Sequence, residues 1–215
     1  GPACAIACGS GTVYRNYFAE VNGRVGQSSH NQINCLNVLE EYFENNRLKL
    51  WEVKNGYAFA STDGLKYLNK RISEFDQIEY ERVKGLVKVG IQWNCEVTIS
   101  SKMIDVTQVY CSALPVAYSH IDSSYWEKFA KLILESIYES TIRTALLNYD
   151  STNNNRLYLT LVGGGAFGNE DEWIIDSVVK ILSKFKNSGL HISFISYDSE
   201  NSIVAKIIDG YGGNK

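Results

Sequence analysis

The sequence predicts a single α/β domain in which helices flank a mixed central sheet of six or seven strands. The C-terminal half alternates strand-like and helical stretches, which is typical of a parallel sheet. One stretch, residues 123–149, has apolar residues at helical spacing and contains no Gly or Pro. The chain has 215 residues, 45% of them hydrophobic, so it can bury one sizeable core and needs no second domain.

β-branched and aromatic residues indicate the strands. The strand-like stretches are residues 11–21, 48–61, 85–99, 106–118, 156–165 and 190–198. The second of them contains Asn55-Gly56, a strong signal for the turn of a hairpin.

Helical spacing and capping residues indicate five helices. They are expected at residues 31–45, 62–75, 123–149, 170–189 and 199–213. Thr62 or Asp63 could cap the second and Ser123 or Ser124 the third, while Gly189 would close the fourth. A polar loop at 149–156 separates the long helix from the strand that follows.

Composition argues against some partners. The formal net charge is -3, so no overall basic field attracts nucleic acid, and an anionic small molecule would have to be held by local dipoles. No run of about 18 apolar residues occurs, so no membrane partner is expected. The five cysteines are odd in number and form no CxxC pair, which fits reduced thiols in the cytoplasm.

A glycine turn between a strand and a helix is the most informative feature. In "LTLVGGGAFGNEDEWI", residues 159–174, the bare backbone of Gly163, Gly164 and Gly165 can approach a phosphate, and the following helix N-terminus favours anions. The spacing is neither a Walker A motif nor a dinucleotide GxGxxG motif. The glycines alone therefore leave open a diphosphate site or a structural turn without a ligand.

Two stretches carry a family resemblance. "LTLVGGGAFGN" resembles the second ligand loop of macrodomains, which wraps the diphosphate and distal ribose of ADP-ribose, and "CEVTISSKMIDVTQVYCSALPVAY" is similar to the stretch that contains their first ligand loop. Together with "TVYRNYF", "NGYAFA" and "YEST", these stretches resemble the arginine-specific macro-type ADP-ribosylhydrolases, a divergent branch related to a bacterial effector that removes ADP-ribose from ubiquitin.

The resemblance implies a macrodomain-like three-layer α/β/α fold. Residues 1–215 would form one domain, with 85–215 as the part similar to the macrodomain core and 1–84 as a divergent N-terminal extension. The Asn-Ala-Ala-Asn motif of common macrodomains and the glycine-rich run after it are absent. Their way of positioning the scissile sugar therefore cannot be transferred to this chain.

Three acids are the candidates for catalysis. Hydrolysis of a ribosyl C–N bond passes through an oxocarbenium-like state, which a carboxylate can stabilise while it activates water. The resemblance points to Asp122 first, which could instead cap the helix at Trp126. Asp105 could be a second acid or a turn residue, and Glu96 is aligned with the adenine-binding acid but could be a solvated strand end.

The candidate ligand-binding residues lie on the two loops and beside Glu96. They are Cys111, Ser112, Ala113, Gly163, Gly164, Gly165, Ala166, Phe167, Gly168, Asn169, Tyr197 and Asn94. Phe167 would pack on the ribose and Tyr197 on adenine, although both could be core aromatics. Asn169 could bond the phosphate or cap the helix.

Two further groups are weaker candidates. Arg15, Asn16 and Tyr17 could line the cleft, but an exposed strand end is the favoured interpretation. Cys111 has no histidine with a partner acid at a readable spacing, which argues against a Cys-His hydrolase.

The predicted activity is hydrolysis of an N-glycosyl linkage, releasing ADP-ribose from a mono-ADP-ribosylated side chain, with arginine as the expected linkage. The expected partners are ADP-ribose and an ADP-ribosylated protein, with ubiquitin as a candidate; no metal or other cofactor is expected, and the protein is expected to be a cytoplasmic monomer. A reader module that binds ADP-ribose without cleaving it would need the same two loops. A structural domain with an empty glycine turn is the third possibility.

Overall fold

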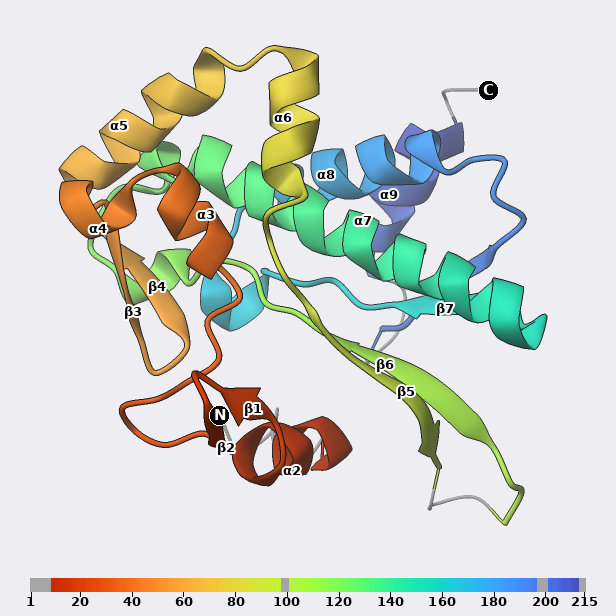
Figure 1. Cartoon of the computed structure of the whole chain (residues 1–215). Coiled ribbons are helices and arrows are strands. Elements are labelled where there is room, and N and C mark those ends of the chain that lie inside the picture. Colours follow the sequence, from red (N-terminus) through yellow and green to blue (C-terminus); the bar gives the residue numbers. More distant parts are fainter. Residues whose placement is uncertain (1–8, 98–100, 197–200, 213–215) are drawn as a thin grey trace.

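The computed structural model describes residues 9–97, 101–196 and 201–212. It mixes helices and strands, as an α/β class predicts (Figure 1). The helices are α2 (Gly9–Tyr17), α3 (Asn37–Tyr42), α4 (Asn45–Leu48), α5 (Thr62–Ser73), α6 (Gln77–Lys84), α7 (Glu127–Thr152), α8 (Asp171–Lys184) and α9 (Ser202–Gly212). The strands are β1 (Glu20–Val21), β2 (Arg24–Val25), β3 (Trp51–Lys54), β4 (Tyr57–Ala60), β5 (Gly90–Glu96), β6 (Asp105–Tyr110), β7 (Arg156–Leu159) and β8 (His191–Phe194). Short 3-10 turns are η1 (Val116–Tyr118), η2 (Ser123–Tyr125) and η3 (Gly165–Phe167).

The strands pair two by two. β1–β2, β3–β4 and β5–β6 are antiparallel hairpins, and β7–β8 is a parallel pair. The residues that the structure describes do not form a hydrogen-bonded sheet of six or seven strands. The parallel pairing expected in the C-terminal half is confirmed, because α8 crosses from the end of β7 to the start of β8.

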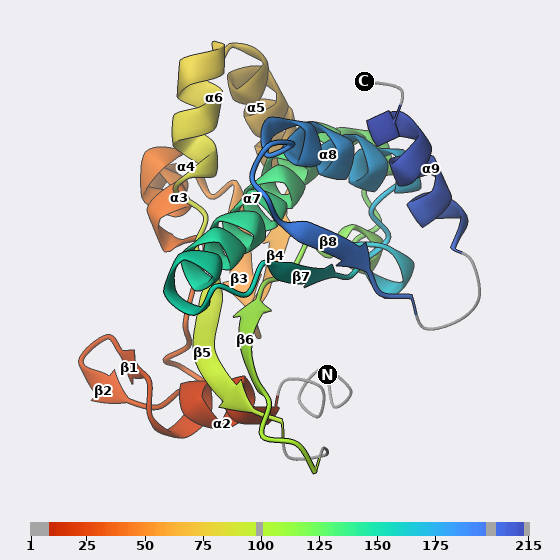
Figure 2. The same cartoon turned by 90° about the vertical axis from the view of Figure 1, so that its right-hand side faces the viewer.

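The strands predicted in the middle of the chain form the β5–β6 hairpin, and among the described residues this hairpin pairs with no further strand. Its two strands pair with each other and extend away from α5, α6 and α8, with α2 beside β5 (Figures 1 and 2). Large apolar side chains on its outer part are exposed, among them Trp93, Ile104 and Val106. β-branched and aromatic content therefore predicted strands within 85–99 and 106–118, although the second strand ends at Tyr110 and the prediction of one large sheet is not met.

The N-terminal stretch 11–21, expected to be a strand, is mostly helical. α2 covers it up to Tyr17, and only Glu20 and Val21 are extended. Val13, Tyr14, Tyr17 and Phe18 recur at helical spacing, so their β-branched and aromatic character was the misleading signal. α2 is attached to the hairpin, where the Ser10 hydroxyl lies 3.1 Å from Gln108 Oε1 and the Gly11 amide donates to the Tyr110 hydroxyl.

The helix expected at 31–45 is interrupted. It is replaced by α3 and α4, which are separated by Glu44 in a left-handed conformation with φ 52°. The buried Asn45 explains the break: its amide donates to the Trp51 carbonyl oxygen and its Oδ1 accepts from the Leu50 amide. Because the Asn45 side chain bonds to the backbone of Leu50 and Trp51, the chain forms the separate helix α4 and does not continue α3.

The predicted caps are shifted by a few residues. α5 spans nearly the expected range, but its cap is Ser61, whose hydroxyl accepts from the Gly64 amide at 3.0 Å, and not Thr62 or Asp63. The long helix α7 begins at Glu127, after η2, and the cap of η2 is Asp122. The α8 helix ends at Lys184, before Gly189.

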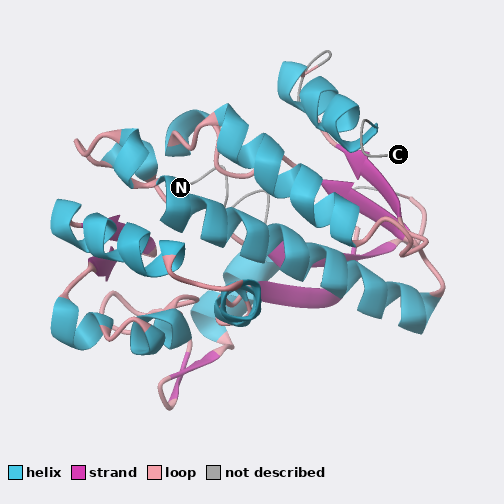
Figure 3. Ribbon diagram, turned by 90° about the horizontal axis from the view of Figure 1, so that it is seen from above, coloured by secondary structure: helices cyan, strands magenta, loops and turns pink. Residues whose placement is uncertain are grey.

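α7 is the centre of the molecule. It contacts α5, α6 and α8, and Figure 2 shows it between the α3–α6 group and the α8–α9 pair. Figure 3 shows the same helices from above, with strands visible beside and beneath them. Trp126 and Phe129 near its start are fully buried, and the Phe129 ring lies 5.2 Å from that of Trp51. Among the described residues, no helix is long and apolar enough to cross a membrane.

Candidate functional site

The two predicted ligand loops lie against each other. Loop one (residues 111–118) follows β6, and loop two (residues 163–169) follows β7. Asn169 joins them: its Nδ2 donates to the Leu114 carbonyl oxygen at 2.8 Å and to that of Gly163 at 3.0 Å. Its backbone amide also donates to the Gly163 oxygen at 2.9 Å. Asn169 is buried, so these bonds fix the loops in a part of the molecule with little competition from water.

The glycines of loop two differ in conformation and in what surrounds them. Gly163 has φ 103°, and a Cβ built on it would lie 2.9 Å from the Cβ of Ala113; Gly168 has φ 67°, and its Cβ would lie 2.6 Å from that of Ala117. These two glycines allow loop two to approach loop one. Gly165 has φ 56° and is exposed, with no atom within 4 Å of the added Cβ. Backbone that a ligand could approach is therefore found at Gly165 and its neighbour Gly164.

Tyr138 of α7 holds the chain that enters loop two. Its hydroxyl donates to the Thr160 carbonyl oxygen at 3.2 Å and accepts from the Val162 amide at 2.9 Å. Burial raises the pKa of Tyr138 to about 12, so the hydroxyl stays protonated at neutral pH. The first residue of the "YEST" stretch thus positions the glycine turn.

Three aromatic rings meet beside the loops. Phe167 of loop two is stacked on Tyr118 of loop one, with ring centroids 5.7 Å apart. The Tyr57 ring from β4 lies 5.4 Å from Tyr118 and 6.0 Å from Phe167. Tyr57 and Tyr118 stand in the stretches "NGYAFA" and "VTQVYCSALPVAYS", and no local pattern in these stretches indicates that the two rings meet. The N-terminal part of the chain contributes to the site through Tyr57.

Asp122 caps η2. Its Oδ1 accepts from the Ser124 amide at 3.0 Å and from the Ser124 hydroxyl at 2.5 Å. These hydrogen bonds lower the pKa of the carboxyl group, first through the hydroxyl and then through the amide. The side chain is exposed and ionised at neutral pH. The capping role that the sequence allowed for Asp122 is present.

The other two acids lie elsewhere. Glu96 and Asp105 are cross-strand partners at the outer end of the β5–β6 hairpin, and both are exposed. Asp105 is separated from the end of β6 at Tyr110 by about 17 Å of strand. Asn94 stands at an irregularity of β5, with φ 53°. The structure does not bring Glu96, Asp105 or Asn94 to the two loops.

The remaining candidates are also placed. Ser112 is exposed and its hydroxyl donates to the Ala113 carbonyl oxygen at 3.0 Å, whereas Ala113 is buried and Cys111 half-buried. Ala166 lies in η3 at the exposed edge of loop two. Tyr197 lies outside the described residues.

The segment 15–17 takes no part in this site. Arg15 and Tyr17 of α2 are exposed. Asn16 accepts from the Gln27 side-chain amide at 2.9 Å and so holds the turn after α2. The described residues include no group of three or more His, Cys, Asp or Glu side chains that could hold a metal ion.

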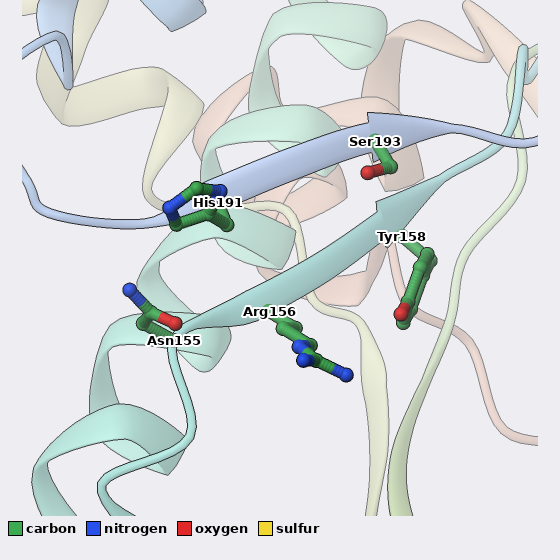
Figure 4. A pocket seen from close by; sticks show the side chains of 5 residues that line it. All are labelled: Asn155, Arg156, Tyr158, His191 and Ser193. Carbon is green, nitrogen blue, oxygen red and sulfur yellow. The ribbon is translucent and has the colours of Figure 1, made fainter.

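A hollow of about 340 Å³ lies on the β7–β8 pair, away from loop two (Figure 4). Its lining comprises Asn155, Arg156, Tyr158, His191 and Ser193. Arg156 and His191 stand at the amino ends of the two strands, whereas loop two follows the carboxyl end of β7. The loops and this hollow are therefore separate features.

Comparison with models of known families, with curated proteins and with solved structures finds no match to this chain.

Proposed function

We propose that this chain binds ADP-ribose on loops one and two and hydrolyses it from mono-ADP-ribosylated side chains, with arginine as the favoured linkage. The proposal rests on the macrodomain-like stretches of the sequence. The observation that supports it most is the contact between the loops: Asn169 bonds to both, and Gly163 and Gly168 let them approach. A three-layer macrodomain-like arrangement is part of the same proposal.

The diphosphate would lie at Gly164 and Gly165. Gly165 is exposed and has open space beside it, and the 14-residue helix α8 begins at Asp171, so its positive dipole end lies close by. The acids at the start of α8 are exposed, which keeps their charge on the solvent side. The ring of Phe167, held between Tyr57 and Tyr118, would border the sugar.

Asp122 is the acid that we assign to the chemistry. It follows Tyr118 by four residues, so its Cα lies within about 14 Å of that of Tyr118. Its Oδ1 is occupied by Ser124, while Oδ2 accepts no hydrogen bond from the described residues and can take a proton from water. The carboxylate would activate this water for attack on the ribosyl carbon as the C–N bond breaks, and the nitrogen leaves with the side chain.

The rival function is a reader that binds ADP-ribose without cleaving it. One observation favours it: Asp122 is engaged as a cap, and Glu96 and Asp105 lie at the far end of a hairpin. Catalysis would then lack an acid aimed at the bound sugar.

Calorimetry with free ADP-ribose tests both functions together. Saturable binding is expected, and it should be lost in Gly165→Val, since a branched side chain there would occupy the space that a phosphate needs. Because φ 56° at Gly165 also strains a branched side chain, thermal unfolding of the variant must show that it is folded at the temperature of the binding measurement. No measurable binding to the native protein would contradict both functions.

Release of ADP-ribose from arginine-, serine- and glutamate-modified proteins then separates the hydrolase from the reader. Asp122→Asn should bind ADP-ribose but lose at least about a hundredfold in turnover, as expected on removal of a general base. Asn is also a good cap, so folding should be retained. Asp63→Asn, which changes an exposed acid on α5, is the matched control. Unchanged turnover of Asp122→Asn would remove Asp122 from the mechanism, and no release from any substrate would favour the reader.

A further inference from the structure

The outer face of the β7–β8 pair is polar and uncovered. Parallel strands normally have both faces buried. Here Leu157 and Leu159 point into the core, while Tyr158 between them is 60% exposed. β8 shows the same alternation, with His191 and Ser193 exposed. An open hollow of about 340 Å³ on a parallel pair is therefore a surface that a ligand can reach.

The register of the strands places the polar side chains in two rows. Arg156 is the Cα partner of His191, and Tyr158 is that of Ser193. Residues two apart on a strand share a face, so the four side chains gather on one side of the pair. Figure 4 shows Arg156 and Tyr158 projecting to the same side of β7, with Asn155 and His191 at the amino ends of the strands. Asn155 is held there by a bond from its amide to the Gly189 carbonyl oxygen.

The lining is rich in donors and carries positive charge. Arg156 supplies a guanidinium, and no carboxylate is among the lining residues, although the chain as a whole has a net charge of -3. Within the described part of the chain, nothing bonds to the side chains of Arg156, Tyr158, His191 or Ser193. Their donors are available to an incoming anion.

We propose that this hollow binds a phosphate monoester whose organic part presents a flat ring to Tyr158. A phosphate offers three strong acceptor oxygens, which match the guanidinium fork of Arg156 with the imidazole of His191 and the Ser193 hydroxyl. The exposed Tyr158 ring can stack on a planar group. The volume is at the lower end of the range of small-molecule pockets, so the ligand is small. The lining of the hollow includes no residue of loop one or loop two, so this inference does not rest on the proposed function.

The probes are phenyl phosphate, AMP, inorganic phosphate and phenol, added at millimolar concentration and followed by calorimetry and by the NMR signals of the His191 ring. Phenyl phosphate or AMP should bind saturably and more tightly than inorganic phosphate, while phenol should not bind. If phenyl phosphate binds more tightly than AMP, the ligand is an aryl phosphate; if AMP binds more tightly, the ligand is a nucleotide. ADP-ribose should not displace phenyl phosphate.

Two variants and a matched control test the assignment. Arg156→Gln should weaken binding of the organic phosphates at least about tenfold, because it removes a charged hydrogen-bond donor. Tyr158→Leu should weaken the ring-bearing probes several-fold and leave inorganic phosphate unchanged. Arg24→Gln changes an exposed arginine on β2 and should have no effect. Absence of saturable binding to the native protein, or unchanged affinity in Arg156→Gln, would overturn the proposal.

Discussion

At the scale of single residues, Asn169 does most to shape the candidate site. Its amide donates to one carbonyl oxygen on each loop, and its Oδ1 is buried without a hydrogen-bond partner among the described residues. The buried Oδ1 carries a desolvation cost, which the two hydrogen bonds from Nδ2 offset.

Asn169→Ala should lower the free energy of unfolding by about 1–2 kcal/mol, because it removes the two buried hydrogen bonds from Nδ2 to the Leu114 and Gly163 oxygens, while the backbone amides of residues 116 and 169 still bond to these oxygens. It should also weaken ADP-ribose binding by releasing loop two. Asn169→Asp should destabilise more, since a carboxylate would face two carbonyl oxygens. Urea unfolding and calorimetry measure the two effects, with the exposed Asn187→Ala as control. A variant of native stability and affinity would mean that the loops are held by other contacts.

Gly163 and Gly164 make a matched pair. Gly163→Ala should destabilise the protein by about 1–2 kcal/mol or more, because φ 103° is unfavourable for Ala and its Cβ would lie 2.9 Å from Ala113. Gly164→Ala should be tolerated, since its nearest contact, Ile174 Cδ1, is at 3.6 Å. Thermal unfolding of both variants tests this difference. Equal loss of stability would show that the close approach of the loops is not what requires glycine.

At the scale of elements, local chemistry explains most of the observed boundaries. Asn55 and Gly56 have φ 53° and 79°, the left-handed pair that a tight hairpin turn needs, and they bring Tyr57 to the site. The start of α5 differs from prediction in its cap: Ser61 bonds the Gly64 amide in place of Thr62 or Asp63, because position relative to the first helical turn decides the cap and not residue type alone. Asp122, a cap that the sequence allowed, bonds the Ser124 amide at the start of η2.

Ser61→Ala should therefore lower the free energy of unfolding by about 1 kcal/mol, because it removes the acceptor for the Gly64 amide at the start of α5. Thr62→Ala, at the neighbouring position first expected to be the cap, should have a smaller effect. Chemical denaturation of the two variants compares them directly. A larger loss in Thr62→Ala would contradict the assignment of the cap.

At the scale of the whole molecule, a network of charges joins α6, α7 and α8. Lys84 is buried and lies 2.9 Å from Glu139 and 3.7 Å from Glu135 of α7. Lys184 of α8 lies 2.8 Å from Glu139, and Arg143 bonds to the same carboxylate. Burial would raise the pKa of Glu139, but the hydrogen bonds from Lys184, Lys84 and Arg143 outweigh it and lower the pKa to about 2.

This shift predicts a loss of stability in acid. The folded-state pKa of Glu139 is below its unfolded value of 4.5, so its contribution is fully present above that value and is lost as the pH falls toward 2. Urea unfolding as a function of pH should show this loss in the native protein, and Glu139→Gln should show a flatter profile over the same range. An identical pH profile in the variant would exclude Glu139 as the source.

The sequence predicted the α/β class, five of the helical regions in outline, the β3–β4 hairpin and the parallel character of the C-terminal strands. These features depend on periodicity and on turn residues within a short stretch of chain, as the Asn55-Gly56 turn and the apolar spacing of α7 illustrate. The prediction of a strand at 11–21 is wrong, because its aromatic residues stand at helical spacing and form α2. The prediction of six or seven strands in one sheet is not met by the described residues. Residue types favour strands but do not choose their partners.

By itself, the sequence predicted the glycine turn of loop two between a strand and a helix, whereas it assigned residues 111–118 to a strand and pointed to loop one only through the family resemblance. Only the tertiary structure decided that Asn169 joins them, that Tyr57 and Tyr118 enclose Phe167, and that Glu96 and Asp105 lie on a hairpin away from them. It also decided that one face of β7–β8 stays open. The physical reason is that each of these outcomes depends on contacts between residues far apart in the chain, and local propensity carries no information about which distant elements pack together.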